Sequence, residues 1–293
     1  MSRFDAFVAV DWSARASLSP TKPTADAIFV CERDNSNATS VSYCRSRSDA
    51  MDLLFATIDR RLTAGQRLLI GFDFAFGYPS GFAQILTGSA SGPAVWSWLD
   101  GEIEDGPDNH NNRFQVAAKM NQIFPGTGPF WGRPRSLDLP LIPERGRDCH
   151  ALSIPQKRQC EVRVPSAQSP WKLYTTGSVG SQSLMGIPKV HQIQRRLGAA
   201  CQVWPFDTGF AVPTAPLVLC EIYPTLFHQS ADTHRDMPTS FAVIKDAQQV
   251  WDCCATFQAM QQSGQLQHAF TAPVKLPNAE AIAREEGWIL GAE

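Results

Sequence analysis

Several features that would assign a function directly are missing from this sequence. None of the eight cysteines stands in a CxxC pair, so the spacing of structural zinc sites is absent. The GxSxG and HExxH motifs are also absent, which leaves serine-hydrolase and zinc-protease chemistry without support. The longest apolar stretches, such as residues 68–72, are far shorter than the roughly 20 residues that span a bilayer. Residues 1–5 lack a signal-peptide apolar region, and we expect a cytoplasmic protein without membrane association.

Charged residues are sparse, at 18% of the chain, and they are unevenly distributed. Residues 113–196 hold 13 Lys and Arg against 4 Asp and Glu, whereas both flanking segments are acidic. A local positive field of this kind steers anionic ligands although the net charge is -2. The alternative is a solvated basic surface. The cations that could face phosphates are Arg113, Lys119, Arg133, Arg135, Lys172, Lys189, Arg195 and Arg196.

The size of the partner is limited by the overall charge. A protein that grips long nucleic acid through many phosphates is usually more basic than a pI of about 6.3. We therefore expect a short nucleic acid or a phosphate-containing small molecule as the partner. The oligomeric state is left open.

The first 73 residues predict a mixed sheet. Alternating apolar segments indicate an antiparallel meander of three strands at 7–11, 27–31 and 40–44. Helical spacing of apolar residues over 51–62 predicts a helix, with Ser48 as its N-cap and Gly65 in a left-handed conformation after its end. Residues 67–73 then read as a central parallel strand, because they are apolar on both faces.

The remainder divides into an irregular middle and a regular end. Residues 80–200 are rich in Gly, Pro and Ser, and we interpret them as an insertion with short helices near 110–124 and 187–198. Strands are expected at 202–206 and 217–223, followed by a helix from about 240 to 262. The prediction is one α/β domain over residues 1–293, with flanking helices and a large insertion.

Four acids occur in apolar contexts and require a shared explanation. Asp11 and Asp73 end apolar segments, Glu221 lies within one, and Asp246 lies in the first turns of the last long helix. A carboxylate in a protein interior is costly unless it is paired, hydrogen-bonded or metal-bound. If the strands that carry them are neighbours, the acids converge at one sheet edge and can hold a hard divalent cation. The alternative is separate turn-capping, ion-pairing and helix-dipole roles.

The same residues carry a resemblance to a known family, the domain-of-unknown-function family 429. The resemblance covers most of the chain, and its motifs are VAVD at 8–11, IGFDFAFGYP at 70–79, CEIYP at 220–224, KDA at 245–247 and EGWI at 286–289. It implies a ribonuclease H-like fold and suspected metal-dependent nuclease activity. It also implies that Asp11, Asp73, Glu221 and Asp246 are the site acids. The long middle departs from the shorter members of that family.

A Gly- and Ser-rich stretch at 177–186 is the main candidate for a phosphate-binding loop. It precedes a helix that we expect to start near Pro188, so backbone N–H groups could meet an anion there. It fits neither of the established phosphate-loop motifs, and a surface loop is the alternative. The candidate substrate-binding residues are Arg113, Lys172, Gly177, Ser178, Gly180, Ser181 and Lys189.

The leading hypothesis from the sequence is a phosphodiester hydrolase that depends on Mg²⁺ or Mn²⁺ and acts on a short nucleic acid or nucleotide. Asp11, Asp73 and Asp246 would be the metal ligands, and Glu221 a ligand or water-orienting group. The first alternative is a protein that binds a nucleotide or pterin-dinucleotide cofactor without cutting it. The second alternative is a catalytically silent interaction module.

Overall fold

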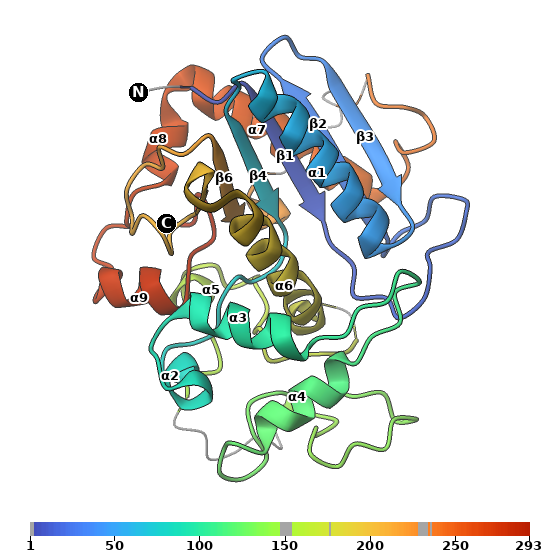
Figure 1. The fold of residues 1–293 in the computed structure, drawn as a ribbon, viewed down its shortest axis with the longest axis vertical. Coiled ribbons are helices and arrows are strands. Elements are labelled where there is room, and N and C mark those ends of the chain that lie inside the picture. The colour runs from blue at the N-terminus through green and yellow to red at the C-terminus, as the bar shows by residue number, and fades with distance from the viewer. Residues whose placement is uncertain (1–2, 147–153, 176, 228–233, 235) are drawn as a thin grey trace.

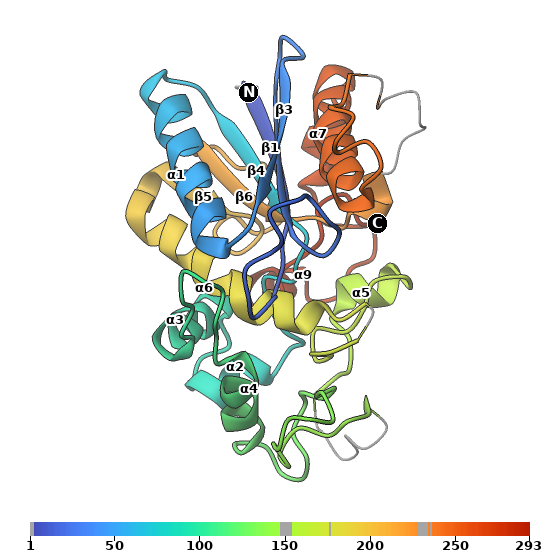
Figure 2. The same cartoon turned by 90° about the vertical axis from the view of Figure 1, so that its right-hand side faces the viewer.

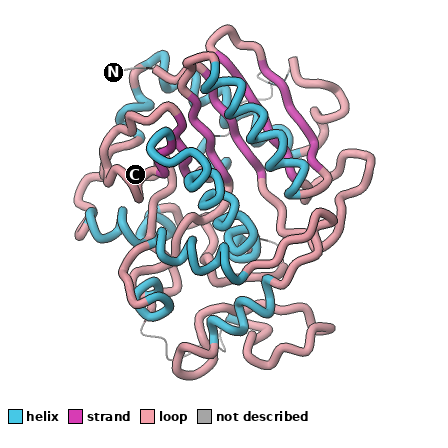
Figure 3. The backbone as a smooth tube through the Cα atoms, viewed as in Figure 1, coloured by secondary structure: helices cyan, strands magenta, loops and turns pink. Residues whose placement is uncertain are grey.

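A six-stranded mixed sheet forms the centre of the molecule (Figures 1 and 3). The computed structural model describes residues 3–146, 154–175, 177–227, 234 and 236–293. The strands lie in the order β3-β2-β1-β4-β6-β5. Their bounds are Ala6–Asp11 for β1, Ile28–Asp34 for β2, Thr39–Cys44 for β3, Leu68–Phe72 for β4, Cys201–Val203 for β5 and Leu217–Glu221 for β6. The predicted α/β class and the mixed sheet are confirmed.

The pairing of the strands follows the sequence pattern. β1, β2 and β3 form the expected antiparallel meander, and β4 runs parallel to both β1 and β6. All five residues of β4 are buried, as expected for a central parallel strand. The fifth strand is shorter than predicted and ends at Val203, because Asp207 closes a turn there. Its carboxylate accepts the Val203 N–H at 2.7 Å and its own N–H donates to the Val203 carbonyl.

Alternate residues of the central strands face two separate apolar layers. One layer includes Val8, Val10 and Ile70, and the other includes Phe7, Ala9 and Leu69. Figure 2 shows α1 (Arg47–Thr63) and α6 (Val179–Leu197) on one side of the sheet and α7 (Lys245–Ser263) on the other. The side of α7 also receives α8 (Gln265–Ala269), which contacts it directly.

The first helix starts two residues earlier than predicted. Ser46, rather than Ser48, is the N-cap, because its hydroxyl accepts the Asp49 N–H while the Asp49 carboxylate accepts the Ser46 N–H. This reciprocal capping box satisfies two N–H groups that a helix start otherwise leaves unpaired. Gly65 follows the helix with a φ of 70°, in the left-handed conformation that its position predicted.

Most of the predicted insertion lies beyond the ends of β1 and β4, whereas its last helix, α6, lies beside the sheet (Figures 1 and 2). It contains α2 (Phe82–Thr87), α3 (Gly92–Glu102), α4 (Arg113–Asn121), α5 (Gln159–Arg163) and α6. The helix predicted near 110–124 is confirmed as α4. α9 (Ala279–Glu285), from the C-terminal region, contacts α3. Some predicted insertion residues, 147–153 and 176, lie outside the described residues.

The helix predicted from Pro188 starts at Val179 instead, so residues 179–186 are helical and do not form the expected loop. Pro188 lies inside the helix. The glycines of this segment serve close packing: a side chain on Gly180 would collide with the carbonyls of Pro170 and Lys172, and one on Gly186 would collide with the Phe74 ring. The last long helix likewise starts at Lys245, five residues after the predicted start.

The packing of Gly186 against Phe74 can be tested with a methyl group. Gly186→Ala should destabilise the protein by about 1–3 kcal/mol, because the ring has to move or the helix has to shift. The control is Gly101→Ala in α3, where nothing lies within 4 Å, and the change should stabilise by about 0.5–1 kcal/mol. Urea denaturation of both variants measures these effects. Equal stabilisation by both substitutions would contradict the close approach.

Across the described residues, none of the helices combines the length and the apolar character that a membrane crossing requires.

Candidate metal-binding cleft

Two of the predicted acids lie side by side at one edge of the sheet. Asp11 is the last residue of β1, and Asp73 directly follows β4. The two strands are parallel neighbours, with Val10 paired to Phe72. The Asp73 N–H donates to the Val10 carbonyl at 3.2 Å. Because parallel strands end at the same edge, their carboxylates are brought together.

A third predicted acid and one unpredicted acid join them from other elements. Asp246 lies in the first turn of α7, and its carboxylate accepts the Asp26 N–H at 2.7 Å. Asp26 precedes β2 and has a left-handed φ of 58°, which aspartate tolerates better than most residues. Both side chains line the same cleft as Asp11 and Asp73. Three of the four acids predicted to converge, Asp11, Asp73 and Asp246, therefore line one cleft together with Asp26.

No ion pair among the described residues neutralises the aspartates at this edge. Asp11 is 8% exposed. One oxygen of Asp73 accepts the Trp12 N–H at 2.7 Å. Within the described part of the chain, no Lys, Arg or His forms an ion pair with Asp11, Asp73 or Asp246. Buried carboxylates without a counter-charge are energetically costly, so the cluster is suited to receive a cation.

The pKa values of these carboxyl groups reflect the crowding. Burial, followed by repulsion from Asp73, holds the pKa of Asp11 well above its usual range. Burial and the nearby Asp246 raise the pKa of Asp73 to about 7, although the Trp12 N–H opposes the shift. The pKa of Asp246 is also raised, by burial and by repulsion from the Asp26 carboxylate, although the Asp26 N–H and the charge of Lys245 oppose the shift. Each shift means that the protein destabilises the ionised form, and a bound cation would reverse that effect.

The raised pKa of Asp73 predicts how stability depends on pH. The group is protonated more readily in the folded chain than in the unfolded chain, where its pKa is about 3.9. Its favourable contribution is therefore complete below about pH 4 and is lost as the pH rises through about 7. The melting temperature in EDTA should fall over this window, and the fall should be smaller for Asp73→Asn. Mg²⁺ should reduce the fall in the wild type. A wild-type curve parallel to that of Asp73→Asn would contradict the shifted pKa.

Glu221 lines the cleft but is already paired. It ends β6 and is 3% exposed. Both of its oxygens accept from the Arg158 guanidinium, at 2.6 and 2.8 Å, and one also accepts the Phe76 N–H. Arg158 in turn contacts the buried Glu161 at 2.8 Å. Glu221 thus differs from the three aspartates, because its charge is neutralised by the protein itself.

The cleft has a volume of about 760 Å³ and is bounded by segments from along the whole chain. Its walls include all four predicted acids and, of the predicted substrate-binding residues, Arg113, Gly177, Ser178 and Ser181. The volume lies within the range of small-molecule sites, about 300–1,000 Å³. The cleft is therefore large enough for a ligand the size of a nucleotide.

Three other predicted substrate-binding residues do not line this cleft. Lys189 forms an ion pair with Asp105 at 3.0 Å. Lys172 lies over the Trp131 ring, with its nitrogen 5.9 Å from the ring centre. Gly180 packs against backbone and donates its N–H to the Lys172 carbonyl at 2.9 Å. These three residues make contacts within the insertion. Of the three predicted substrate-binding cations, Arg113 is therefore the one that lines the cleft.

Sequence reasoning missed several residues of the cleft walls. Asp26, Arg15 and Glu161 line the cleft, as does Arg158. Asp26 and Arg15 lie in the irregular connection between β1 and β2, and Arg158 immediately precedes the short α5. The sequence offered a weak signal for Arg15 alone, which lies four residues after Asp11. The segment around it has no periodicity that would predict where its side chain lies.

These carboxylates suit a hard divalent cation whose other coordination positions are filled by water and substrate phosphates. Carboxylate oxygens are the groups that Mg²⁺ and Mn²⁺ prefer. Among the described residues, no three His, Cys, Asp or Glu side chains are grouped so that they could hold a metal ion by themselves. Mg²⁺ usually takes only one or two carboxylates together with water and substrate phosphates. Asp11 and Asp73 match that requirement in type and position, and neither forms an ion pair within the part of the chain that the structure describes.

Comparisons with known proteins add no identification: the chain matches no family model, no curated protein and no solved structure.

Proposed function

We propose that this protein is a hydrolase of phosphodiester bonds that depends on Mg²⁺ or Mn²⁺ and acts on a short nucleic acid or a nucleotide. The observation that carries the proposal is the convergence of Asp11, Asp73 and Asp246 on one cleft without an ion-pair partner among the described residues. A protein has little reason to keep three repelling carboxylates together unless a cation binds there.

The proposal assigns a role to each of the four acids. Asp11 and Asp73 hold the cation from adjacent strand ends, and Asp246 completes the site from α7. A divalent cation supplies Lewis-acid activation and a counter-charge for a phosphate oxygen. The Trp12 N–H fixes one oxygen of Asp73 and leaves the other to the cation. Glu221, held by Arg158, stays in place as a positioning group at the cleft wall.

Two further observations support the proposal. The antiparallel meander β1–β3 next to parallel strands, with helices on both faces, is consistent with a ribonuclease H-like fold. The acids that the resemblance to the domain-of-unknown-function family 429 implies are also the acids that line the cleft. Metal-dependent cleavage is the activity that this family is suspected to have.

Calorimetric titration with Mn²⁺ and Mg²⁺ tests the site directly. The wild type should bind a cation, and binding should be lost in Asp11→Asn and in Asp73→Asn. The matched control is Asp52→Asn, which removes an exposed carboxylate of α1 outside the cleft. Because substrate phosphates can complete the site, each titration is repeated with a non-hydrolysable nucleotide. Binding that is equal in all variants would refute the assignment.

Two other results would favour the alternative functions. A nucleotide that raises the melting temperature without turnover would favour a cofactor-binding protein. An absence of any effect of metal and nucleotide on stability would favour a silent interaction module.

A further inference from the structure

The connection between β1 and β2, residues 12–27, begins at the proposed metal site. It directly follows Asp11, the last residue of β1. Its first residue, Trp12, donates its N–H to the Asp73 carboxylate at 2.7 Å. The Trp12 carbonyl accepts from the side chain of Gln182 in α6 at 2.5 Å. A shift of the connection would therefore move one proposed ligand and remove a hydrogen bond from another.

The third proposed ligand is held by the same connection. The Ser13 hydroxyl donates to the Asp26 carbonyl at 2.8 Å, and the Asp26 N–H donates to the Asp246 carboxylate at 2.7 Å. Ser13 is buried, with 8% of its surface exposed. The relative positions of all three proposed ligands thus depend on the backbone conformation of the connection.

Arg47, the first residue of α1, fixes that backbone. Its side chain is 1% exposed. One terminal nitrogen of its guanidinium donates to the Ser13 carbonyl at 3.1 Å and to the Arg15 carbonyl at 2.8 Å. A guanidinium presents five N–H donors in a rigid plane. One side chain can therefore hold both carbonyls while its other donors bind a second partner.

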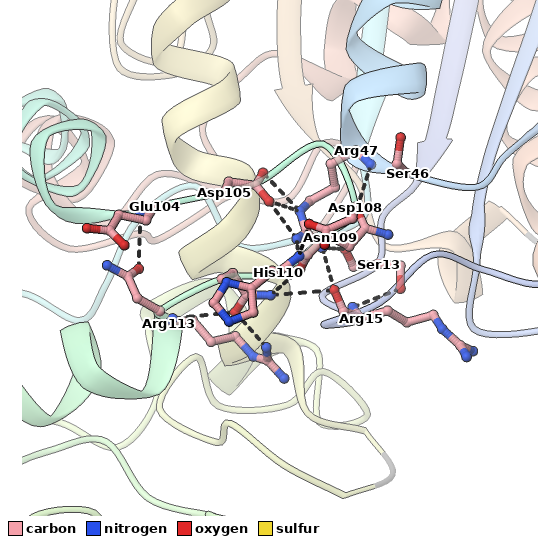
Figure 4. Close-up of polar contacts among 12 residues, drawn as sticks. Ser13, Arg15, Ser46, Arg47, Glu104, Asp105, Asp108, Asn109, His110 and Arg113 are labelled. Atoms are coloured by element: carbon pink, nitrogen blue, oxygen red, sulfur yellow. Dashed lines mark hydrogen bonds and ion pairs between the residues drawn. The ribbon is translucent and has the colours of Figure 1, made fainter.

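That second partner is a turn of the insertion, residues 105–111, between α3 and α4 (Figure 4). The Asp105 carboxylate accepts from the Arg47 guanidinium at 2.6 Å. The Asn109 side chain accepts the Arg47 backbone N–H at 2.9 Å, and the Asn109 carbonyl accepts from the guanidinium at 2.9 Å. Asn109 also donates to the Ser17 carbonyl at 3.1 Å. The insertion thus contacts the connection both directly and through Arg47.

The turn has a defined conformation, which a positioning role requires. Asp105 and Asn111 form an antiparallel bridge across it. Asn109 adopts a left-handed φ of 72°, which asparagine tolerates better than most residues. A second part of the insertion supports the turn, because Lys189 of α6 forms its ion pair with Asp105.

We propose that the insertion completes the metal site, with Arg47 as a positioning residue that fixes the connection and, through it, the three proposed ligands. The inference rests on the proposed function, since it takes the aspartates to be metal ligands, and it assigns a role to the insertion. Because Asp105 neutralises the guanidinium, Arg47 acts through the position of the connection and not through a charge in the cleft. Loss of a group that orients metal ligands typically lowers metal affinity or activity by about 10- to 100-fold.

Calorimetric titration of Arg47→Lys with Mn²⁺ tests this role. Lysine keeps a positive charge beside Asp105, but an ammonium group cannot hold that carboxylate and two carbonyls in the same planar geometry. The variant should bind Mn²⁺ at least about tenfold more weakly than the wild type. The matched control is Arg61→Lys in the last turn of the same helix, which alters a partly buried ion pair with Glu32 outside the cleft walls. This control should bind Mn²⁺ as the wild type does.

Amide hydrogen exchange in EDTA separates positioning from a general loss of stability. The N–H groups of Trp12 and Asp26 are bonded to proposed ligands, and both should exchange faster in Arg47→Lys than in the wild type. The acceleration at these two amides should exceed that of the Ile70 amide in the central strand β4. A merely destabilised fold would give the two amides no excess over β4.

Ser13→Ala is a second test that keeps the Arg47 side chain and its ion pair. It removes the hydroxyl that bonds the Asp26 carbonyl. Mn²⁺ binding should weaken by about two- to tenfold, the contribution of one hydrogen bond. The matched control is Ser183→Ala, which removes a buried hydroxyl of α6 outside the cleft walls. If Arg47→Lys does not fold, Ser13→Ala decides the question.

The outcomes separate this inference from the proposed function. Wild-type Mn²⁺ affinity in Arg47→Lys and in Ser13→Ala would overturn the inference, and persistent turnover would leave the hydrolase intact. Mn²⁺ binding that weakens in these variants, in a protein without phosphodiester turnover, would refute the hydrolase and leave the role of Arg47 intact. Absence of Mn²⁺ binding by the wild type would refute both.

Discussion

Asp11→Asn and Asp73→Asn are each expected to lower metal-dependent phosphodiester turnover by roughly 100-fold or more. Each substitution keeps the shape of the side chain and removes one anionic ligand. Lewis-acid stabilisation by a metal is worth several kcal/mol in the transition state, and each 1.36 kcal/mol corresponds to about tenfold in rate. The measurement is kcat/KM for a short oligonucleotide at saturating Mn²⁺.

The same substitutions should have the opposite effect on the metal-free protein. Because Asp11 and Asp73 repel each other in a buried site, Asp11→Asn should raise the melting temperature in EDTA at pH 8. A variant that is inactive because it is misfolded would instead melt earlier. Asp52→Asn should change neither quantity. Full turnover in both Asp11→Asn and Asp73→Asn would exclude the two residues from the reaction.

Arg158→Met is expected to cause the largest loss of stability, about 3–5 kcal/mol. Arg158 is 1% exposed and lies between two buried carboxylates, Glu161 and Glu221. It also donates to the Glu286 carbonyl at 3.0 Å. Removal of the guanidinium would leave two buried negative charges without a partner, and folded proteins typically have a total stability of only about 5–15 kcal/mol. Urea denaturation at pH 8 measures the loss.

A double variant separates charge from packing. Arg158→Met combined with Glu221→Gln should recover part of the lost stability, because one of the two stranded charges is gone. The control is Arg195→Met, which removes an arginine that is 68% exposed and paired at 3.4 Å, and such surface pairs contribute at most about 1 kcal/mol. If Arg158→Met cost no more than Arg195→Met, the buried network would not stabilise the fold.

The sheet and its acids could be predicted because their signals are local. An apolar segment that ends in Asp marks the end of a strand, and neighbouring parallel strands end at one edge, so Asp11 and Asp73 could be placed together. Asp246 was placed correctly in a helix although the start of that helix was predicted five residues too early. The error came from residues 241–244, which are apolar although residues 240–243 form turns before the helix.

The rest depended on contacts between distant residues, which a single sequence does not reveal. The start of α6 was missed because Gly and Ser favour loops, whereas the close packing of Gly186 on Phe74 favours helix here. Arg158 lies 63 residues from Glu221 in the chain, in a segment without periodicity. Lys189 resembled a ligand-binding cation, but its charge is used by Asp105. Only the fold distinguishes a paired cation from an unpaired one.

The order in which the cleft residues occur along the chain has a consequence for protein synthesis. The aspartates enter the cleft from positions 11, 26, 73 and 246, and a chain is made from its N-terminus. A ribosome that has released β1 and β4 has therefore made the first three acids, while the residue that bonds the Asp26 N–H is not yet translated. A partial chain of this length lacks the third proposed ligand, and the cleft is complete only in a chain that includes α7, which packs against β1.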